Sequence, residues 1–303
     1  TCGEDVSGSK IISTHKHLKL QNFKEKLEKF NKNVIMTDTA KSITKSWLKL
    51  DLQSRCITRD LKWGTPVPGE KDKVFYVWFD APIGYLSILK HAKGDVKVNE
   101  WYQFMAKDNV PFHTVLFPAT LLGTNKEKDY PMVTHLSAVE YLQLENGQKF
   151  SKSKNIGVFG DELIQLDDLF DLNEDYWRFY LISIRPENND TYFSWENFVN
   201  SCNSNLVNNL GNYFNRCIRL VQSFLGKQIL EYSNDFTDRD EHVKDIIKRY
   251  DESFTNLSLR GGLDIALEFG RYLNKAIHDD QPWVTWKKES DAEMKKKTIK
   301  TLT

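Results

Sequence analysis

The sequence predicts an α/β region followed by an all-α region. Before about residue 145, short apolar runs end at glycine, proline or polar residues, which is typical of buried strands in a parallel sheet. After about residue 200, apolar residues recur at spacings of three and four, as they do along one face of a helix. A chain of 303 residues is long enough to hold both a sheet domain and a helical bundle.

The first sixty residues combine a polar start with two periodic segments. The alternating run at residues 15–20 (HKHLKL) predicts an edge strand, and the pattern from Phe23 to Phe30 predicts a helix. Residues 61–145 should contain the main strands. We expect these strands over Val74–Phe79, His113–Phe117 and Met132–His135, with a helix beginning at Ala119–Gly123.

Residues 146–200 predict a loop followed by short elements rich in aromatic residues, and residues 201–303 predict three or four antiparallel helices. The first of these helices should end at Gly226. Two further helical patterns cover Asp238–Leu257 and Leu263–His278. One apolar stripe should face the bundle core from the first helix, and it consists of Val207, Leu210, Phe214, Ile218, Val221 and Leu225.

The composition excludes several classes of protein. With 40% hydrophobic and 13% aromatic residues, the chain can build a packed core and is not a disordered tail. Its 42 basic and 42 acidic residues balance, which excludes a uniformly basic nucleic-acid coat protein but leaves local patches such as Lys287–Thr303. No apolar run approaches the roughly 20 residues that cross a bilayer, so we expect no membrane partner.

The termini and the cysteines indicate the compartment. The sequence starts with polar and acidic residues, and we expect no secretory or transit peptide. The four cysteines lie far apart and form neither a metal-ligand nor a disulfide pattern: Cys2, Cys56, Cys202 and Cys217. This usage is typical of a reducing compartment, so the sequence predicts a cytoplasmic protein.

Residues 149–153 (KFSKS) form the most informative motif. Gly147 and Gly157 flank it and give the backbone the freedom that a mobile loop needs. Two lysines and two hydroxyl groups suit a polyphosphate, because the ammonium groups neutralise charge and the hydroxyl groups add hydrogen bonds. On these residues alone, a solvated lysine-rich surface turn remains open as the alternative.

A second motif lies upstream at residues 73–88 (KVFYVWFDAPIGYLSI), where an apolar run meets a Pro-Ile-Gly turn. The rings of Trp78 and Tyr85 would form an apolar wall, and their N–H and O–H groups would add polar contacts. Such a wall suits a ligand with a flexible thioether, because sulfur contacts aromatic edges favourably. On spacing alone, packing in the core is the better explanation of both side chains.

Together the two motifs closely resemble the methionyl-tRNA synthetases, class I aminoacyl-tRNA synthetases whose signature loop reads Lys-Met-Ser-Lys-Ser. The resemblance covers essentially the whole chain and is to the eukaryotic cytosolic type, with Phe150 in place of the signature methionine. The other class I signature, His-Ile-Gly-His, is absent, since none of the seven histidines is followed by x-Gly-His. The resemblance therefore implies the C-terminal portion of such an enzyme.

The resemblance also implies a domain organisation. Residues 1–60 would be the end of the connective insertion and the return to the catalytic domain, and residues 61–145 the second half of the Rossmann-type catalytic domain. Residues 146–200 would hold the signature loop and a stem-contact fold, and residues 201–303 an anticodon-binding helical bundle. The resemblance implies that Cys2 would be the last cysteine of the insertion's zinc knuckle, whose other ligands would lie in the missing part of the insertion. A single cysteine cannot hold zinc, so no residue is assigned to a metal.

In this family, methionine reacts with ATP to give methionyl-adenylate, which is then transferred to tRNA-Met. Mg²⁺ is expected with ATP. The resemblance assigns catalysis to Lys149 and Lys152, which would stabilise the leaving pyrophosphate. It assigns ATP binding to the same lysines with Asp108, Ser151 and Ser153. The methionine pocket would consist of Trp78, Ala81, Pro82, Tyr85 and His113, and we expect Trp78 and Tyr85 to be largely buried and to border a common cavity with His113.

The resemblance places anticodon recognition on the helical bundle. Asn212 and Arg216 would contact anticodon bases through hydrogen bonds, and Trp283 would stack on a base, so we expect these three side chains to converge on one solvent-facing site. With Asn205 and Asn208, the first two form one helical row, which should face solvent away from the apolar stripe. On spacing alone, the solvent-facing side of an amphipathic helix explains this row better than a binding site does.

Two alternative functions remain open at this point. Leucyl, isoleucyl, valyl and cysteinyl synthetases also carry a Lys-Met-Ser-Lys-Ser loop, although the segment at residues 81–85 (APIGY) speaks against them. The other alternative is a non-catalytic tRNA-binding fragment, since the chain alone is expected to be inactive without the histidine signature. Its zero net charge and retained ATP loop fit that role poorly.

Overall fold

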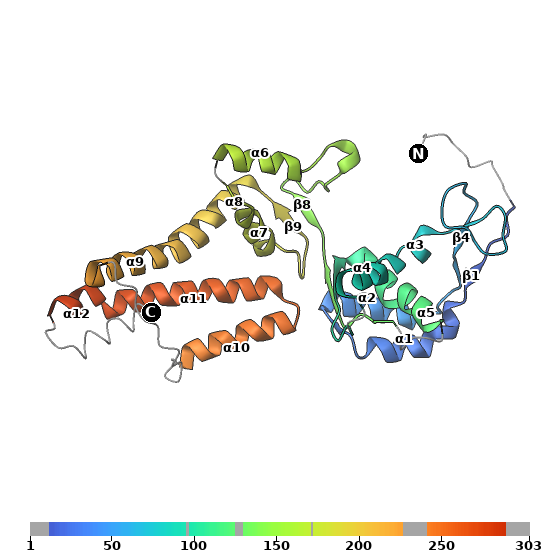
Figure 1. The fold of residues 1–303 in the computed structure, drawn as a ribbon, viewed down its shortest axis with the longest axis horizontal. Helices are drawn as coiled ribbons and strands as arrows, with labels where there is room; N and C mark the ends of the chain where they lie inside the picture. Colours follow the sequence, from blue (N-terminus) through green and yellow to red (C-terminus); the bar gives the residue numbers. More distant parts are fainter. Residues whose placement is uncertain (1–11, 95–96, 125–129, 171, 227–240, 289–303) are drawn as a thin grey trace. The chain divides into compact units, whose positions relative to one another are not determined.

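The computed structural model describes residues 12–94, 97–124, 130–170, 172–226 and 241–288 (Figure 1). The chain folds as two compact units, Thr1–Ala138 and Val139–Thr303. The first unit mixes strands and helices, and the second ends in long helices, so the predicted order of an α/β region and then helices is confirmed. The predicted roles of Cys2 and of residues 289–303 lie outside the described residues.

A three-stranded sheet forms the centre of the first unit, in the order β2 (Ile35–Met36), β7 (His135–Val139) and β6 (Tyr102–Ala106). β2 and β7 are parallel, with Ile35 opposite His135. The first four residues of β7 are buried, as expected for a strand covered on both faces. The core on this sheet consists of Val34, Met36, Ala40, Val110, Val133, Leu136 and Ala138.

The third predicted strand begins later than expected. The sequence predicted a strand over Met132–His135, whereas β7 starts at His135. The side chain of Thr134 explains the shift, because its hydroxyl group accepts a hydrogen bond from the backbone N–H of Trp101 at 2.8 Å. The chain is thereby anchored just before it enters the regular ladder.

Helices and a small ribbon complete the N-terminal part of this unit. β1 (His17–Leu18) pairs antiparallel with β3 (Arg55–Cys56), so the predicted edge strand is confirmed over only two residues. A 3₁₀ turn, η1 (Leu20–Phe23), then turns Leu20 fully into the core and ends the strand. The predicted helix is confirmed as α1 (Lys24–Asn31), and α2 (Asp38–Lys49) follows β2.

The predicted strand over Val74–Phe79 is wrong beyond its second residue. β5 (Val74–Phe75) pairs antiparallel with β4 (Thr58–Arg59), and a helical turn, α3 (Val77–Asp80), follows before α4 (Ile83–Lys93). A short apolar run does not distinguish a strand from a helical segment, and a strand extends only as far as its partner. Because β4 has only two residues, the ladder stops at Phe75.

The predicted strand over His113–Phe117 is also wrong. Residues Phe112–Leu116 form a π-helical segment, η3, which continues into α5 (Phe117–Leu122). The segment is buried from Phe112 to Val115, so its apolar character reflects burial on all sides and not strand geometry. The helix predicted from Ala119 is confirmed.

The second unit begins with a small parallel ribbon and an aromatic core. β8 (Leu142–Leu144) and β9 (Thr191–Phe193) pair in parallel. The connecting helices are η4 (Lys152–Lys154), α6 (Gly160–Phe170) and α7 (Glu174–Ser183), and α8 (Trp195–Ser201) follows β9. The core contains Trp177, Tyr180, Phe193, Phe198 and Cys202, and the rings of Trp177 and Phe198 stack at 4.1 Å.

The helical bundle follows α8 directly. Its elements are the π-helix η5 (Cys202–Gly211), α9 (Asn212–Leu225), α10 (Glu241–Thr255), α11 (Leu259–Asp280) and α12 (Pro282–Lys288). Figure 1 shows α10 and α11 side by side and antiparallel, and Arg249 on α10 bonds Glu268 on α11 at 2.6 Å. Gly226 ends α9 with φ 65°, as predicted. The first residues of the predicted helix from Asp238 lie outside the described residues.

The apolar stripe predicted for the first bundle helix is partly wrong. Val207, Phe214 and Ile218 are 52%, 58% and 55% exposed. The bundle core instead receives a neighbouring line that includes Cys217 and Tyr213. The π-helix η5 explains the difference, because its wider turns rotate the following residues away from the 3.6-residue period that the stripe assumed.

Candidate functional site

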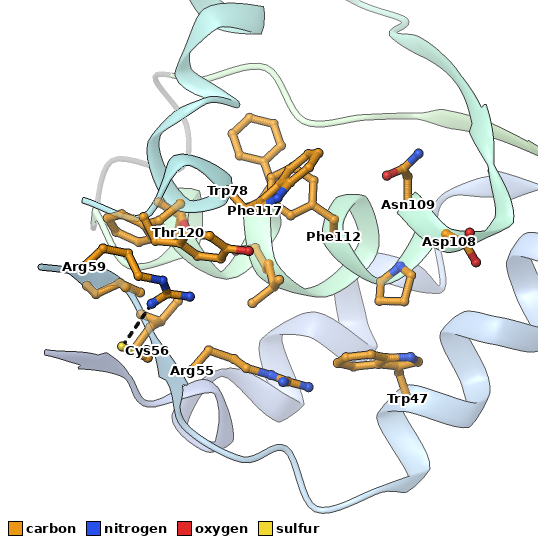
Figure 2. A pocket seen from close by; sticks show the side chains of 16 residues that line it. Trp47, Arg55, Cys56, Arg59, Trp78, Asp108, Asn109, Phe112, Phe117 and Thr120 are labelled. Carbon is orange, nitrogen blue, oxygen red and sulfur yellow. Dashed lines mark hydrogen bonds between the residues drawn. The ribbon is translucent and has the colours of Figure 1, made fainter. Parts of the chain in front are cut away.

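A cavity of about 560 Å³ lies in the first unit and is lined by aromatic and cationic side chains (Figure 2). Arg55 lies over the ring of Trp47, with 5.1 Å from its guanidinium carbon to the ring centroid. Arg59 lies 3.7 Å over the ring of Tyr76 in the same way. These stacked cations give the cavity a positive, aromatic wall that suits an anionic or π-rich ligand.

Two of the predicted site residues line this cavity, Trp78 and Asp108. Trp78 reaches it from α3, where its ring contacts the edge of Phe112 at 5.4 Å. Asp108 reaches it from a 3₁₀ turn, η2 (Lys107–Asn109), at the carboxyl end of β6, and is exposed. Ligands of α/β sheets bind at this end of the strands, so the position suits a ligand-binding carboxylate.

The predicted burial of Trp78 and Tyr85 is wrong. Their side chains are 50% and 38% exposed, whereas His113 is only 6% exposed. Tyr85 and His113 do not line the cavity shown in Figure 2. Of the three residues predicted to border one cavity, only Trp78 does so. The helical turn of α3 explains the exposure of Trp78, because a strand would have directed it into the sheet.

Tyr85 and His113 nevertheless form a defined pair. The Tyr85 hydroxyl oxygen lies 3.1 Å from Nε2 of His113, and Nδ1 of His113 lies 2.9 Å from the carbonyl oxygen of Asn109. A carbonyl only accepts, so Nδ1 carries the proton, and Nε2 of the neutral ring accepts from the Tyr85 hydroxyl group. Burial lowers the pKa of His113, although the bond to Asn109 opposes this. The ring is therefore neutral at pH 7.

The two remaining predicted pocket residues lie between Trp78 and Tyr85. Pro82 is buried and precedes the first residue of α4, while Ala81 is exposed. The fixed φ of proline suits this helix start. Three of the five predicted residues, Trp78, Tyr85 and His113, form one aromatic segment through ring contacts, because the ring of Phe112 contacts both Trp78 and His113 and the ring of His113 contacts Tyr85.

The KFSKS loop belongs to the second unit and is a tight turn. Ser151 and Ile156 exchange two backbone hydrogen bonds, of 2.8 and 3.0 Å. Between them lies η4, which ends at Asn155 in the left-handed conformation with φ 52°. Lys152 and Ser153 lie on this turn and are exposed, and the hydroxyl groups of Ser151 and Ser153 are 3.4 Å apart. The loop thus presents its lysine and hydroxyl groups to solvent.

The remaining residues of the loop hold it in place. Phe150 packs against the aromatic core of the second unit, which explains why an apolar residue suits this position of the motif. Gly157 lies so close that a Cβ there would be 2.9 Å from Cδ1 of Phe150. The ammonium group of Lys149 lies 4.5 Å over the ring of Tyr141. The turn is therefore anchored on its apolar side and cationic on its exposed side.

A second cavity, of about 450 Å³, lies in the helical bundle. The predicted row lines it with Asn205, Asn208, Asn212 and Arg216, so these four residues do lie together. Arg271 and Asn274 from α11 complete the lining, and the sequence reading missed them. Their spacing of three puts them on one face of α11, but nothing local to α9 indicates that this face lies opposite.

Trp283 also lies at this face, as predicted. The guanidinium carbon of Arg216 is 5.7 Å from the centroid of its ring. The indole is half-buried and packs against the core residues Cys217 and Ile277. The predicted convergence of Asn212, Arg216 and Trp283 is thus seen, and the tryptophan is held by the core beside the arginine.

The described part of the chain holds neither a cluster of metal-ligating side chains nor a helix that could span a membrane. Within residues 12–94, 97–124, 130–170, 172–226 and 241–288, no group of three or more His, Cys, Asp and Glu side chains is placed to hold a metal ion. Among the helices that the structure describes, none is both long enough and apolar enough to span a membrane.

Known proteins match this chain along most of its length. The family model for tRNA synthetases class I (M) matches residues 4–218. The methionine–tRNA ligase of Acanthamoeba polyphaga mimivirus is 40% identical over 292 residues, which cover 92% of this chain and 52% of the viral protein. The cytoplasmic methionine–tRNA ligase of Homo sapiens is 43% identical over 289 residues, which cover 89% of this chain and 31% of the human protein.

A solved structure has the same fold. It is the Mycobacterium tuberculosis methionyl-tRNA synthetase in complex with methionyl-adenylate, with a TM-score of 0.76 and 24% identity, covering 96% of this chain and 57% of that one. The chain spans about half the length of the viral relative and about a third of the human one. Because the family model covers more than half of its 303 residues, the chain belongs to the methionyl type of class I tRNA synthetases.

Proposed function

We propose that this chain supplies the ATP loop, part of the methionine pocket and the anticodon face of a cytoplasmic methionine–tRNA ligase. The exposed KFSKS turn carries the proposal, since it combines the family motif with a geometry that presents Lys152 to a ligand. The relatives named above are methionine–tRNA ligases, and the M. tuberculosis structure holds methionyl-adenylate, the product of the ATP-dependent step.

The first reaction joins methionine to AMP. The methionine carboxylate attacks the α-phosphorus of ATP, the bond to the bridging oxygen breaks, and pyrophosphate leaves with the bonding electrons. Negative charge grows on the leaving group, and Lys152 and Lys149 would stabilise it, because cations held near developing charge lower the barrier most. The Ser151 and Ser153 hydroxyl groups would donate to phosphate oxygens.

Mg²⁺ would accompany ATP, because this ion is usually held mainly by the substrate's phosphates, with one or two carboxylates and water. Bound there, it would neutralise phosphate charge. The protein's own share of this charge neutralisation lies with the loop lysines.

The methionine side chain would lie against the aromatic segment of the first unit. Trp78 and Phe112 present ring edges and faces, and sulfur contacts with such rings are favourable. The neutral His113, fixed by Tyr85 and Asn109, adds a polar group without adding charge. Asp108 would accept hydrogen bonds from the ribose hydroxyl groups of ATP.

The bundle face would bind the anticodon. Asn212 and Arg216 offer hydrogen-bonding groups into one cavity, and Trp283 offers a ring beside them. Unpaired RNA bases are recognised by such combinations of polar edges and stacking rings. This surface would select tRNA-Met, whose anticodon reads CAU.

Amino-acid-dependent exchange of pyrophosphate into ATP by the whole synthetase tests this proposal. We expect exchange with methionine and not with leucine, isoleucine, valine or cysteine. Charging of a tRNA-Met transcript with methionine should follow. A whole protein that binds tRNA-Met without any exchange would instead be a non-catalytic binding module.

A further inference from the structure

Asn274 on α11 is fixed by oxygen atoms of the adjoining backbone. Its amide nitrogen Nδ2 lies 2.8 Å from the carbonyl oxygen of Asn209, 2.9 Å from that of Gly270 and 3.3 Å from Oδ1 of Asn209. The reverse orientation would place the amide oxygen against three other oxygens. The nitrogen of Asn274 therefore points into the bundle, and its oxygen Oδ1 points outward.

This outward oxygen accepts a hydrogen bond from Asn212. Nδ2 of Asn212 lies 2.8 Å from Oδ1 of Asn274, although the two residues are 62 positions apart. The nitrogen of Asn212 is thereby directed toward α11. Its own carbonyl oxygen Oδ1 makes no hydrogen bond to any residue in the described part of the chain.

Asn209, whose oxygen atoms accept from Asn274, is buried where two helices pack closely. Asn209 is 6% exposed and donates to the carbonyl oxygen of Leu267 at 2.9 Å. Gly270 lets α11 approach the π-helix η5, since a Cβ there would lie 2.6 Å from Cδ2 of Leu210 and 2.9 Å from Oδ1 of Asn209. The hydrogen bonds through Asn274 therefore fix the orientation of the exposed Asn212 side chain relative to the backbone.

We propose that Asn274 is a positioning residue that makes Asn212 present its carbonyl oxygen, and not its amide nitrogen, to the base in the bundle cavity. Arg216 and Arg271 line the same cavity and can only donate. An acceptor beside donors complements cytosine, whose N4 amino group donates and whose N3 accepts. Uracil has the opposite order, with O4 accepting and N3–H donating. This inference rests on the proposed anticodon function.

The test measures kcat/KM for aminoacylation of tRNA-Met transcripts with the anticodons CAU and UAU by the whole synthetase. Asn274→Ala should lower the CAU-to-UAU ratio by about tenfold, the typical value of one well-made base contact. Asn256→Ala is the matched control, because Asn256 also donates to a helix carbonyl, that of Glu252 at 2.8 Å, but lies outside the cavity. Its ratio should equal that of the wild type.

A double variant separates positioning from general stabilisation. If Asn274 acts through Asn212, then Asn274→Ala changes nothing further in the Asn212→Ala background. An unchanged ratio in Asn274→Ala, an equal loss in the Asn212→Ala background, or a similar loss in Asn256→Ala would each overturn the assignment. If Asn274→Ala does not fold, as judged by thermal unfolding, Asn274→Leu decides, because it keeps about the same volume and offers Asn212 no acceptor; it should lose the same preference.

The failure of the proposed function looks different. In that case, Asn212→Ala and Arg216→Ala themselves leave the CAU-to-UAU ratio unchanged. If these two variants lower the ratio and Asn274→Ala does not, the anticodon face stands and only the positioning role of Asn274 is refuted.

Discussion

Lys152 is the residue on which the proposed chemistry depends most. It is exposed on the 3₁₀ turn η4, and its charge would be needed mainly as pyrophosphate leaves. Lys152→Ala should raise the barrier to adenylate formation by about 3 kcal/mol, or roughly a hundredfold in rate, with little change in KM for methionine. Pyrophosphate-exchange kinetics of the whole synthetase measure both quantities.

Lys154 provides the matched control, since it lies on the same exposed turn outside the motif. Lys154→Ala should retain the exchange rate of the wild type. Normal turnover in Lys152→Ala with only a raised KM for methionine would assign that lysine to substrate binding instead.

His113 makes stability depend on pH in one direction. Burial lowers its pKa in the folded protein, so the unfolded chain takes up a proton first as the pH falls below about 6.5. Its contribution to stability is therefore full above that pH and is lost as the pH falls toward the folded pKa. The urea midpoint of the whole synthetase should drop between pH 7.5 and 5.5, and less so in His113→Gln. Equal drops in both proteins would contradict the assignment.

The sequence predicted residue positions well where the relevant geometry is local. Asn205, Asn208, Asn212 and Arg216 line one cavity because their spacing alone places them in a row. Asn274 was missed because its contact with Asn212 depends on how two helices pack. The burial of Trp78 was mispredicted because its direction depends on whether residues Val77–Asp80 form a strand or a helix.

The KFSKS loop is the element whose shape most limits substitution. A methyl group on Gly157 would come 2.9 Å from the Phe150 ring, and overpacking of this kind typically costs about 1–3 kcal/mol. Gly157→Ala should therefore shift the loop and slow pyrophosphate exchange. Gly160→Ala is the control, since no atom lies within 4 Å of a Cβ there, and it should be neutral. Equal rates in the two variants would show that the Phe150 contact does not set the loop geometry.

The short helix α12 carries the predicted stacking residue. Trp283→Ala should weaken aminoacylation through the KM for tRNA, since stacking of one base is worth about 1–3 kcal/mol, while adenylate formation stays unchanged. Trp286→Ala is the control on the same helix, because that ring stacks on Phe224 at 4.6 Å. It should lower thermal stability more than tRNA affinity. An unchanged tRNA KM in Trp283→Ala would leave the indole as a packing anchor only.

Long helices were predicted from the sequence more accurately than short strands. The helices α9, α10 and α11 have long periodic patterns, and each was expected close to where it lies. The strands have two to five residues, so their limits depend on partners that the sequence does not reveal. The π-helix η5 changed the buried face of the first bundle helix, and no local pattern indicates that change.

At the scale of the whole molecule, the first unit exposes apolar residues on one continuous stretch of chain. Val77, Trp78, Ile83 and Ile88 are all at least half exposed along α3 and α4, and Phe104 on the sheet-edge strand β6 is 54% exposed. Exposed apolar surfaces and sheet edges of this extent usually bind another part of a protein. We expect the whole synthetase to cover them with a segment from the part of the relatives' length that these 303 residues do not match.

The fold class was predictable because it follows from two periodicities, short apolar runs and then helical spacing, which hold over long stretches. The family was predictable because the KFSKS motif is typical of class I synthetases and the segment at residues 73–88 indicates the methionyl type among them. The pairing of the two small antiparallel ribbons was not predictable, since each strand contributes only two residues and no periodicity.

Methionine-dependent pyrophosphate exchange, measured for the 303-residue chain and for the whole synthetase, tests the proposed function most directly. We expect robust exchange by the whole protein, a loss of roughly a hundredfold on Lys152→Ala, and no exchange by the 303-residue chain alone. Exchange by the isolated chain would contradict the claim that it holds only part of the active site. Full activity of the Lys152→Ala synthetase would contradict the claim that this loop carries the chemistry.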